Sequence, residues 1–359
     1  MKKLLFVAPA ISYGGAEKNF IGIANYAVKN GYEVHLMTEY GKEPMRFIDP
    51  NIIQHFAEIS ENDNAKSRWI KSILAVRKLI KQIHPDVVIS FIESWRSACV
   101  LASRFTNTKC IVSERADPYS RGKRYDKLIF TIFSLADGFV FQTEQAMNFF
   151  NKKVQRKGTV IPNPVFKDDI LLPYDGPKKD IIVSIARLDI KQKRQDLLIA
   201  AFEKIADKYP TYVLNLYGDG KDLTTLRKLA NKTSYGNRIH FCGVTRDVRK
   251  AIGEAKLSVL SSDYEGIPNV IIESMCVGTP VVSTKCSPGG AELLITDEIN
   301  GLLVERGNAD ALAKAMDKIL ESKEFSDKLA QNAFDIKDRF NETEILSKWI
   351  EYIQEVLTH

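Results

Sequence analysis

Cysteine is scarce in this 359-residue chain, and its five cysteines show no paired spacing. No two of them form a CxxC motif, which argues against a disulfide framework and against a zinc knuckle. The five histidines do not follow the spacing of metal ligands either. These absences favour free thiols in a reducing compartment.

Long hydrophobic runs are absent as well. No apolar stretch approaches the roughly 20 residues that a membrane-spanning helix needs. The opening Met1-Lys2-Lys3 is followed by LLFVAPAI, which is too short for a secretory leader and predicts a buried first strand. With 45% hydrophobic and 27% charged residues, the composition is typical of a soluble globular protein.

Short apolar runs alternate with helical patterns along the whole chain, and most of these runs are continuous. That pattern is typical of parallel strands covered by helices on both faces, so it predicts an α/β protein. The strands predicted in the first half are 4–8, 34–38, 87–92, 110–114, 138–143 and 159–163. Those predicted in the second half are 181–187, 213–218, 239–244, 257–262, 281–284 and 301–304.

A proline-rich break at 162–180 separates the two arrays and predicts a linker. We therefore expect two Rossmann-like, doubly wound domains, 1–164 and 165–341, facing each other across a cleft. Apolar residues recur at helical spacing near the C-terminus. We assign this last helix, 342–359, to the first domain.

The two halves differ in charge. Residues 1–164 hold 24 Lys/Arg against 15 Asp/Glu, a net charge of +9, whereas residues 165–359 have a net charge of −3. Basic stretches at 66–84, 121–130 and 151–158 suit an anionic membrane surface or a pyrophosphate-bearing lipid. The alternative is that the apolar stripe of 69–83 packs on the sheet while its lysines face water. A nucleic-acid-binding role is a weaker alternative, because no helix-turn-helix, OB or RRM signature occurs.

The segment EGIPNVIIE, Glu265 to Glu273, carries the strongest chemical signal. Pro268 predicts the start of a helix over 269–277 that ends at Gly278. The free N–H groups of such a helix start, with Gly266 beside them, can bind phosphate or sugar hydroxyls. Carboxylates accept hydrogen bonds from vicinal hydroxyls, so one glutamate can hold a sugar and the other a ribose. The plainer alternative is a solvated Glu265 and an ordinary helical Glu273.

Near the N-terminus, Gly14 and Gly15 precede a helix predicted to begin near Ala16. Their backbone N–H groups can approach a phosphate, and the positive end of the helix points to the same place. On its own, the glycine pair is equally consistent with a plain tight turn.

Over nearly its whole length the sequence resembles the retaining family 4 glycosyltransferases of the GT-B fold. EGIPNVIIE matches the Glu-x7-Glu motif of that family, and SYGGAEKNF (12–20) is similar to its Gly-Gly-Ala-Glu loop. SIARLDIKQKRQDLLIAAF (184–202) is similar to its second-domain opening, and LYGDG (216–220) to its Gly-Asp-Gly turn. Ala186 replaces the usual glycine, and the chain has one extra residue before the lysine, so Lys191 competes with Lys193. The spacing to Asp196 favours Lys193.

The resemblance implies a role for each matching residue. Arg187 and Lys193 stabilise the departing diphosphate and, with Glu265, form the catalytic set; Glu273 holds the ribose. The implied donor-binding residues are Gly14, Gly15, Gly218, Gly220, Gly266, Ile267, Pro268, Asn269, Val270 and Glu273. Glu17 and Arg115 are candidates for binding the acceptor or a phosphate. Arg115 stands where many members carry a histidine; pairing with Glu114 or Asp117 is an equally good explanation of it.

The implied activity is transfer of a hexose or N-acetylhexosamine, with retention, from a UDP-linked sugar to a lipid-linked or polysaccharide acceptor. Capsule or exopolysaccharide synthesis fits such an activity. No metal or other cofactor is expected, since side-chain cations serve the diphosphate and no Asp-x-Asp motif occurs. The expected location is the cytoplasm, peripheral on the inner face of the cell membrane. A related GT-B enzyme such as an epimerase is the alternative.

Overall fold

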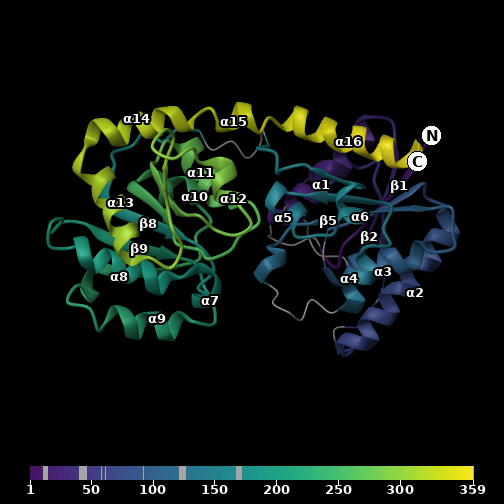
Figure 1. The fold of residues 1–359 in the computed structure, drawn as a ribbon, viewed down its shortest axis with the longest axis horizontal. Helices are drawn as coiled ribbons and strands as arrows, with labels where there is room; N and C mark the ends of the chain where they lie inside the picture. The colour runs from purple at the N-terminus through teal and green to yellow at the C-terminus, as the bar shows by residue number, and fades with distance from the viewer. Residues whose placement is uncertain are drawn as a thin grey trace. The chain divides into compact units, whose positions relative to one another are not determined.

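The computed structural model describes residues 1–10, 15–39, 47–57, 59–60, 62–91, 93–120, 127–166 and 172–358. It forms two compact units, Met1–Pro164 together with Glu342–His359, and Val165–Asn341. Each unit has one parallel sheet accompanied by helices (Figure 1). No helix among the described residues is long and apolar enough to cross a membrane.

The first unit contains a sheet in the order β3-β2-β1-β4-β5-β6-β7, seven strands among the described residues. The strands are β1 (Lys3–Val7), β2 (Glu33–Thr38), β3 (Ile53–Phe56), β4 (Val87–Ser90), β5 (Lys109–Glu114), β6 (Gly138–Phe141) and β7 (Gly158–Val160). Its helices are α1 (Gly15–Lys29), α2 (Ala65–Ile83), α3 (Glu93–Ser103), α4 (Lys127–Phe133), α5 (Glu144–Asn148), α6 (Lys152–Gln155) and α16 (Glu342–Thr358). β1, β4, β5 and β6 are wholly or almost wholly buried, which explains their continuous apolar sequences.

Local signals set the limits of α2. The side chain of Asn64 accepts a hydrogen bond from the Ser67 N–H at 2.9 Å and so caps the first turn. At the other end His84 takes a left-handed conformation and Pro85 follows, and a proline cannot continue a helix.

The C-terminal helix α16 belongs to the first unit. The Tyr352 hydroxyl accepts a hydrogen bond from the Phe139 N–H at 2.7 Å, and Tyr26 and Ser347 share one at 2.9 Å. Trp349 of this helix is fully buried, with its ring 5.3 Å from that of Phe91. These contacts hold the C-terminal helix on the first unit, whose sheet contains β1, the first strand of the chain.

The second unit repeats the architecture, with the strand order β10-β9-β8-β11-β12-β13. The strands are β8 (Lys179–Ile185), β9 (Val213–Tyr217), β10 (Ile239–Gly243), β11 (Ala255–Leu260), β12 (Val281–Thr284) and β13 (Leu302–Val304). The helices are α7 (Ile190–Lys193), α8 (Gln195–Ile205), α9 (Leu223–Ala230), the 3-10 turn η3 (Gly236–Arg238), α10 (Val248–Gly253), α11 (Asn269–Val277), α12 (Gly290–Leu294), α13 (Ala309–Glu321), α14 (Lys323–Ala333) and α15 (Ile336–Arg339).

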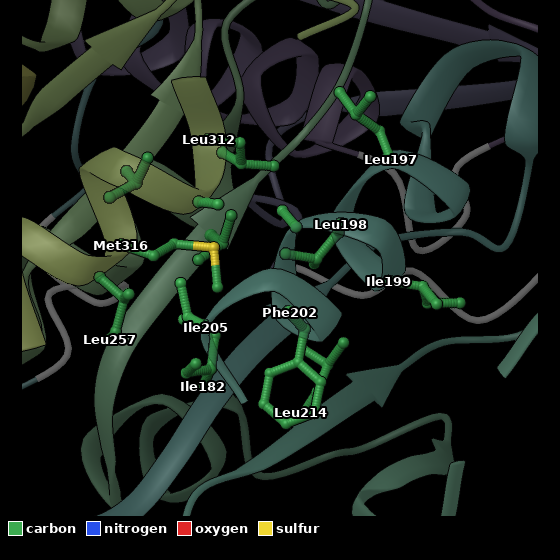
Figure 2. Close-up of a cluster of buried hydrophobic side chains, with 14 of the residues drawn as sticks. Ile182, Leu197, Leu198, Ile199, Phe202, Ile205, Leu214, Leu257, Leu312 and Met316 are labelled. Carbon is green, nitrogen blue, oxygen red and sulfur yellow. The ribbon is translucent and has the colours of Figure 1, made fainter. Parts of the chain in front are cut away.

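The core of the second unit lies between its sheet and the helices α8 and α13. Figure 2 shows Phe202 of α8 beside Leu214 of β9, with Met316 of α13 near Leu257 of β11. Phe202 is fully buried, and burying such a side chain contributes about 1.5–3 kcal/mol. This packing holds the strand ends, where the candidate site lies.

Candidate active site

The site residues predicted in the second unit gather at one edge of its sheet. Strand order reverses between β8 and β11, since β9 and β10 lie on one side and β12 and β13 on the other. In open α/β sheets, ligands bind beyond the carboxyl ends of the strands at such a reversal. Arg187 follows β8 and Glu265 follows β11, so both lie at this point of the sheet.

Lys193 and Glu265 are in direct contact. The Lys193 Nζ donates to Glu265 Oε1 at 2.5 Å, with side chains only 16% and 10% exposed. The Ser262 hydroxyl donates to the same oxygen at 2.6 Å. The Glu265 N–H also donates to the Ser287 carbonyl at 2.8 Å. The carboxylate is therefore held rigidly beside a cation, in a poorly hydrated place where charges interact strongly.

Arg187 lies two residues beyond the end of β8, so the strand predicted to reach 187 is shorter than expected. Its guanidinium donates to Gln192 Oε1 at 2.9 Å, and Gln192 in turn donates to the Tyr264 carbonyl at 3.2 Å. This chain of contacts joins the segment after β8 to the segment after β11. Lys191 is exposed, whereas Lys193 contacts Glu265, so the geometry favours Lys193 between the two lysines.

The helix start predicted at Pro268 is present. α11 begins at Asn269 and ends before Gly278, which has a left-handed conformation with φ +81°. Pro268 offers no side-chain acceptor to the first-turn N–H groups, so these donors suit an anionic or hydroxylated ligand. Ile267 is buried, while Gly266, Asn269 and Val270 are half-buried at this helix start. Glu273 lies one turn further on and is half-buried too.

Two glycine contacts shape the loops around this helix start. A Cβ on Gly290 would lie 1.7 Å from the Gly266 carbonyl oxygen, so the two backbones can meet only because residue 290 has no side chain. On the other side of the site, Gly218 has φ +131° and a Cβ there would lie 2.0 Å from the Ala186 carbonyl oxygen. The Leu188 N–H donates to the Asp219 carbonyl at 2.9 Å. The Gly218–Gly220 turn is thereby packed against the segment that carries Arg187.

The first-unit candidates are not brought together in the same way. Gly14 lies outside the described residues, Gly15 is the first residue of α1, and Glu17 lies in the first turn of that helix. Arg115 follows β5, where its guanidinium lies 4.3 Å from the centre of the Phe91 ring and 5.4 Å from that of Trp349.

The Arg115 Nη1 donates to Asn163 Oδ1 at 2.9 Å. The Nε and Nη2 of the same side chain are buried and have no hydrogen-bond partner among the described residues, which is costly for a charged group. Burial lowers the pKa of this guanidinium to about 9, although the nearby Glu114 carboxylate acts to raise it. Arg115 therefore stays charged near neutral pH and retains two donor nitrogens, Nε and Nη2, that no described residue uses.

The Glu114 carboxylate holds the loop that carries Arg115 in place. Glu114 Oε1 accepts hydrogen bonds from the N–H groups of Arg115 and Ala116, both at 3.1 Å. The other Glu114 oxygen lies 3.0 Å from Arg96 Nη1, and both side chains are almost completely buried. Arg96 also donates to the Ser113 carbonyl at 2.9 Å.

Sequence reasoning missed several of these groups. Ser262 and Gln192 touch the predicted site residues, and the buried Gln195 donates to the Arg187 carbonyl at 2.9 Å. The position of Ser262 three residues before Glu265 was the only available signal, and it is weak. Gln192 and Gln195 could not be found, because their roles depend on how separate loops meet.

Comparison with known proteins gives a family match in each half of the chain. Residues 13–168 match the model of "Glycosyltransferase Family 4", and residues 175–335 match that of "Glycosyl transferases group 1". A Campylobacter jejuni N-acetyl-D-galactosaminyltransferase, named for a GalNAc–GalNAc–diNAcBac-PP-undecaprenol acceptor, is 26% identical over 361 residues, covering 99% of each chain.

Two solved structures have the same fold. Anabaena HepE in complex with UDP-glucose has a TM-score of 0.79 at 18% identity, covering 99% of this chain and 100% of that one. An S. aureus TarM variant in complex with UDP and alpha-GlcNAc-glycerol has a TM-score of 0.78 at 15% identity, covering 98% and 99%. Both family matches, one in each half, and two parallel sheets of GT-B type lead to one assignment. The chain belongs to the family 4 glycosyltransferases of the GT-B fold.

Proposed function

We propose that this glycosyltransferase moves a hexose or N-acetylhexosamine from a UDP-sugar to a lipid-linked or polysaccharide acceptor, with retention at the anomeric carbon. The observation that carries the proposal is the Lys193–Glu265 contact at the strand-order reversal, 2.5 Å long, beside Arg187. Relatives named for undecaprenol-linked and poly(ribitol-phosphate) acceptors support the acceptor class. Neighbours solved with UDP and UDP-glucose support the donor class.

Each site residue has a separate task in this proposal. Arg187 and Lys193 bind the diphosphate, whose negative charge increases as the bond to the sugar breaks, and fixed cations stabilise that charge best. The N–H groups at the start of α11, with Gly266 to Val270, bind phosphate or sugar oxygens. Gly218 and Gly220 allow the donor to approach the backbone.

The two glutamates position the donor and transfer no proton. Glu265 is held by Lys193 and Ser262, and it orients sugar hydroxyls with its remaining acceptor capacity. Glu273 holds the ribose diol. The acceptor hydroxyl attacks from the face that the diphosphate leaves, so the leaving group itself is the nearest base.

We also propose that turnover needs no metal ion, because Arg187 and Lys193 supply the positive charge that a divalent cation would otherwise provide. Turnover by the purified enzyme should be the same with and without EDTA. Loss of turnover that Mg²⁺ or Mn²⁺ restores would contradict this part of the proposal.

The first unit is proposed to bind the acceptor and to contact an anionic membrane at the inner face of the cell membrane. α2 exposes Ile70 and Leu74, 43% and 62% accessible, next to the exposed Lys71 and Lys78. Apolar and cationic groups on one helix face suit binding at an anionic lipid interface. Arg115, with its unused donors, and Glu17 are proposed to bind the acceptor or its phosphate.

The experiment that tests the function is a panel of nucleotide-sugars, screened by thermal shift and then for hydrolysis of the donor. A UDP-sugar that binds at 100 times its Kd stabilises the folded protein by about 2.7 kcal/mol. We expect a UDP-hexose or UDP-N-acetylhexosamine to raise Tm and to be hydrolysed slowly. No response to any nucleotide-sugar would refute the proposal.

A further inference from the structure

A cavity of about 290 Å³ lies in the first unit, apart from the residues discussed so far. Its floor contains Pro9, which follows β1, and Glu39, which follows β2, and the Glu39 N–H donates to the Pro9 carbonyl at 2.9 Å. Trp95, in the helix that follows β4, also lines it. Strand order in this sheet reverses between β1 and β4, so the cavity lies at the carboxyl edge where doubly wound sheets bind ligands.

Two indole rings in the lining are held in place. Trp95 is 2% exposed, and its Nε1 donates to Glu39 Oε1 at 3.2 Å. The Trp69 Nε1 donates to the Ser97 hydroxyl at 2.8 Å, which ties α2 to α3. The ring positions are therefore fixed by hydrogen bonds at the ring edge, and such pre-set aromatic surfaces bind ligands at little entropic cost.

Glu39 is a carboxylate that is only 4% exposed. Arg68 Nη2 donates to its Oε2, and Trp95 donates to its Oε1. A carboxylate has about four acceptor sites, so the two bonds that the described residues make leave capacity for further donors. A ligand rich in hydroxyl groups would add charge-assisted hydrogen bonds to this buried carboxylate.

We propose that this cavity is a subsite for one sugar ring of the acceptor glycan. Hydroxyl groups of the sugar would bind Glu39 and Arg68, and its C–H face would contact the half-buried indole of Trp69, whose face carries negative charge density. The volume is at the lower limit of ligand pockets, which are about 300–1,000 Å³, and so fits one ring rather than a whole nucleotide-sugar. A phosphate would find no unpaired cation among the lining residues, because Arg68 is already paired with Glu39. The identification of the ring as part of an acceptor rests on the proposed function.

One substitution at the exposed side of the cavity can fill it while keeping the hydrogen bonds of Glu39, Trp95 and Trp69. Ala65, the first residue of α2, is exposed and lines the cavity, so Ala65→Trp places a large side chain in the space. Gln82 lies in the last turn of the same helix, is exposed and is not part of the lining. Gln82→Trp is therefore the matched control for adding an indole to α2.

The test is a titration of the full-length wild type and both variants, monitored by saturation-transfer NMR. The ligands are the methyl α-glycosides of glucose, galactose, N-acetylglucosamine and N-acetylgalactosamine. We expect at least one glycoside to bind the wild type and Gln82→Trp equally, with a Kd on the order of 1–10 mM. Ala65→Trp should bind it at least tenfold more weakly. No glycoside binding by the wild type, or equal binding by Ala65→Trp, would overturn the subsite.

The same samples are titrated with the UDP-sugar panel, which separates the two proposals. UDP-sugar binding that is equal in all three proteins, with glycoside binding lost only in Ala65→Trp, supports both. UDP-sugar binding without a glycoside response removes the subsite alone. Glycoside binding without any response to UDP-sugars removes the proposed donor chemistry and the acceptor role of the cavity.

Discussion

Arg96 and Glu114 form an ion pair that water hardly reaches, with side chains 2% and 1% exposed. Removing one partner of a buried pair leaves the other charge without compensation, which costs about 3–5 kcal/mol. Glu114 keeps its two backbone hydrogen bonds, so we predict that Arg96→Met lowers the free energy of unfolding by up to about this amount. Urea denaturation followed by circular dichroism measures the change.

Lys2 and Asp86 provide the control for that prediction, because their 2.8 Å pair is largely exposed on the lysine side. Lys2→Met should change the free energy of unfolding by less than about 1 kcal/mol. Equal losses in the two variants would show that burial of the Arg96–Glu114 pair does not matter for stability.

At this scale the sequence indicated candidate residues for the site but not their contacts. The Glu-x7-Glu spacing identified Glu265, and the spacing to Asp196 favoured Lys193 over Lys191. The contact between Lys193 and Glu265 joins residues 72 positions apart, and no local pattern encodes such a distance. The sequence did not indicate Glu39, Arg68 and Trp95 as neighbours for the same reason, since three separate segments contribute them.

At the scale of elements, β3 pairs only with β2 in the described sheet and is held partly by a histidine pair. His35 Nδ1 and His55 Nε2 share a hydrogen bond at 2.8 Å, and their rings are stacked 5.1 Å apart. Glu33 Oε1 lies 2.9 Å from His35 Nε2 and 3.1 Å from Lys3 Nζ. Burial, and to a lesser extent the neighbouring His35, lowers the pKa of His55 below its ordinary value.

A lowered histidine pKa makes the folded protein harder to protonate than the unfolded chain. The stability that His55 contributes is therefore complete above its ordinary pKa of about 6.5 and is lost as pH falls toward the lowered value. We predict that Tm falls between about pH 7 and about pH 5, and that His55→Asn reduces this dependence. Thermal melts across that range test it, and an unchanged pH dependence in His55→Asn would contradict it.

Glu33 loses its charge at a lower pH than the range of that measurement. Hydrogen bonding to His35 and to Lys3 lowers the pKa of Glu33 below 4.5. The stability that this carboxylate contributes is present above about pH 4.5 and is lost only in more acidic solution. Within this cluster, a change above about pH 5 that is lost in His55→Asn is therefore assigned to His55 and not to Glu33.

The elements themselves were largely predictable. Parallel strands buried on both faces have continuous apolar sequences, and each predicted strand overlaps an observed one. β3 was missed because its burial is slight and its sequence, IQHF, has no apolar run. The helix over 269–277 was predicted with its observed limits, because proline and glycine mark both ends.

At the scale of the whole molecule, the net charge of +9 in residues 1–164 is the basis of the proposed membrane contact. Each Lys or Arg near an anionic surface contributes about 1 kcal/mol, and salt weakens this attraction. We predict binding to vesicles of phosphatidylglycerol but not of phosphatidylcholine, measured by co-sedimentation. Leu74→Ser should weaken binding several-fold.

Val244 supplies the control, since it is 76% exposed but lies in the second unit. Val244→Ser should bind the vesicles as the wild type does. Equal binding by Leu74→Ser and the wild type would exclude α2 from the membrane contact.

The central claim is that fixed cations at the strand-order reversal of the second unit drive departure of the diphosphate. The most direct measurement compares turnover of the UDP-sugar by the wild type, Lys193→Met and Lys191→Met under saturating donor. Lys193 contacts Glu265 and Lys191 is exposed two residues away, so the variants remove the same charge from neighbouring positions. Loss of a group that stabilises the transition state typically costs about 10²–10³ in kcat. The account predicts such a loss in Lys193→Met, assayed at a temperature where all three proteins are fully folded, and near-normal turnover in Lys191→Met. Near-normal turnover in Lys193→Met would contradict it.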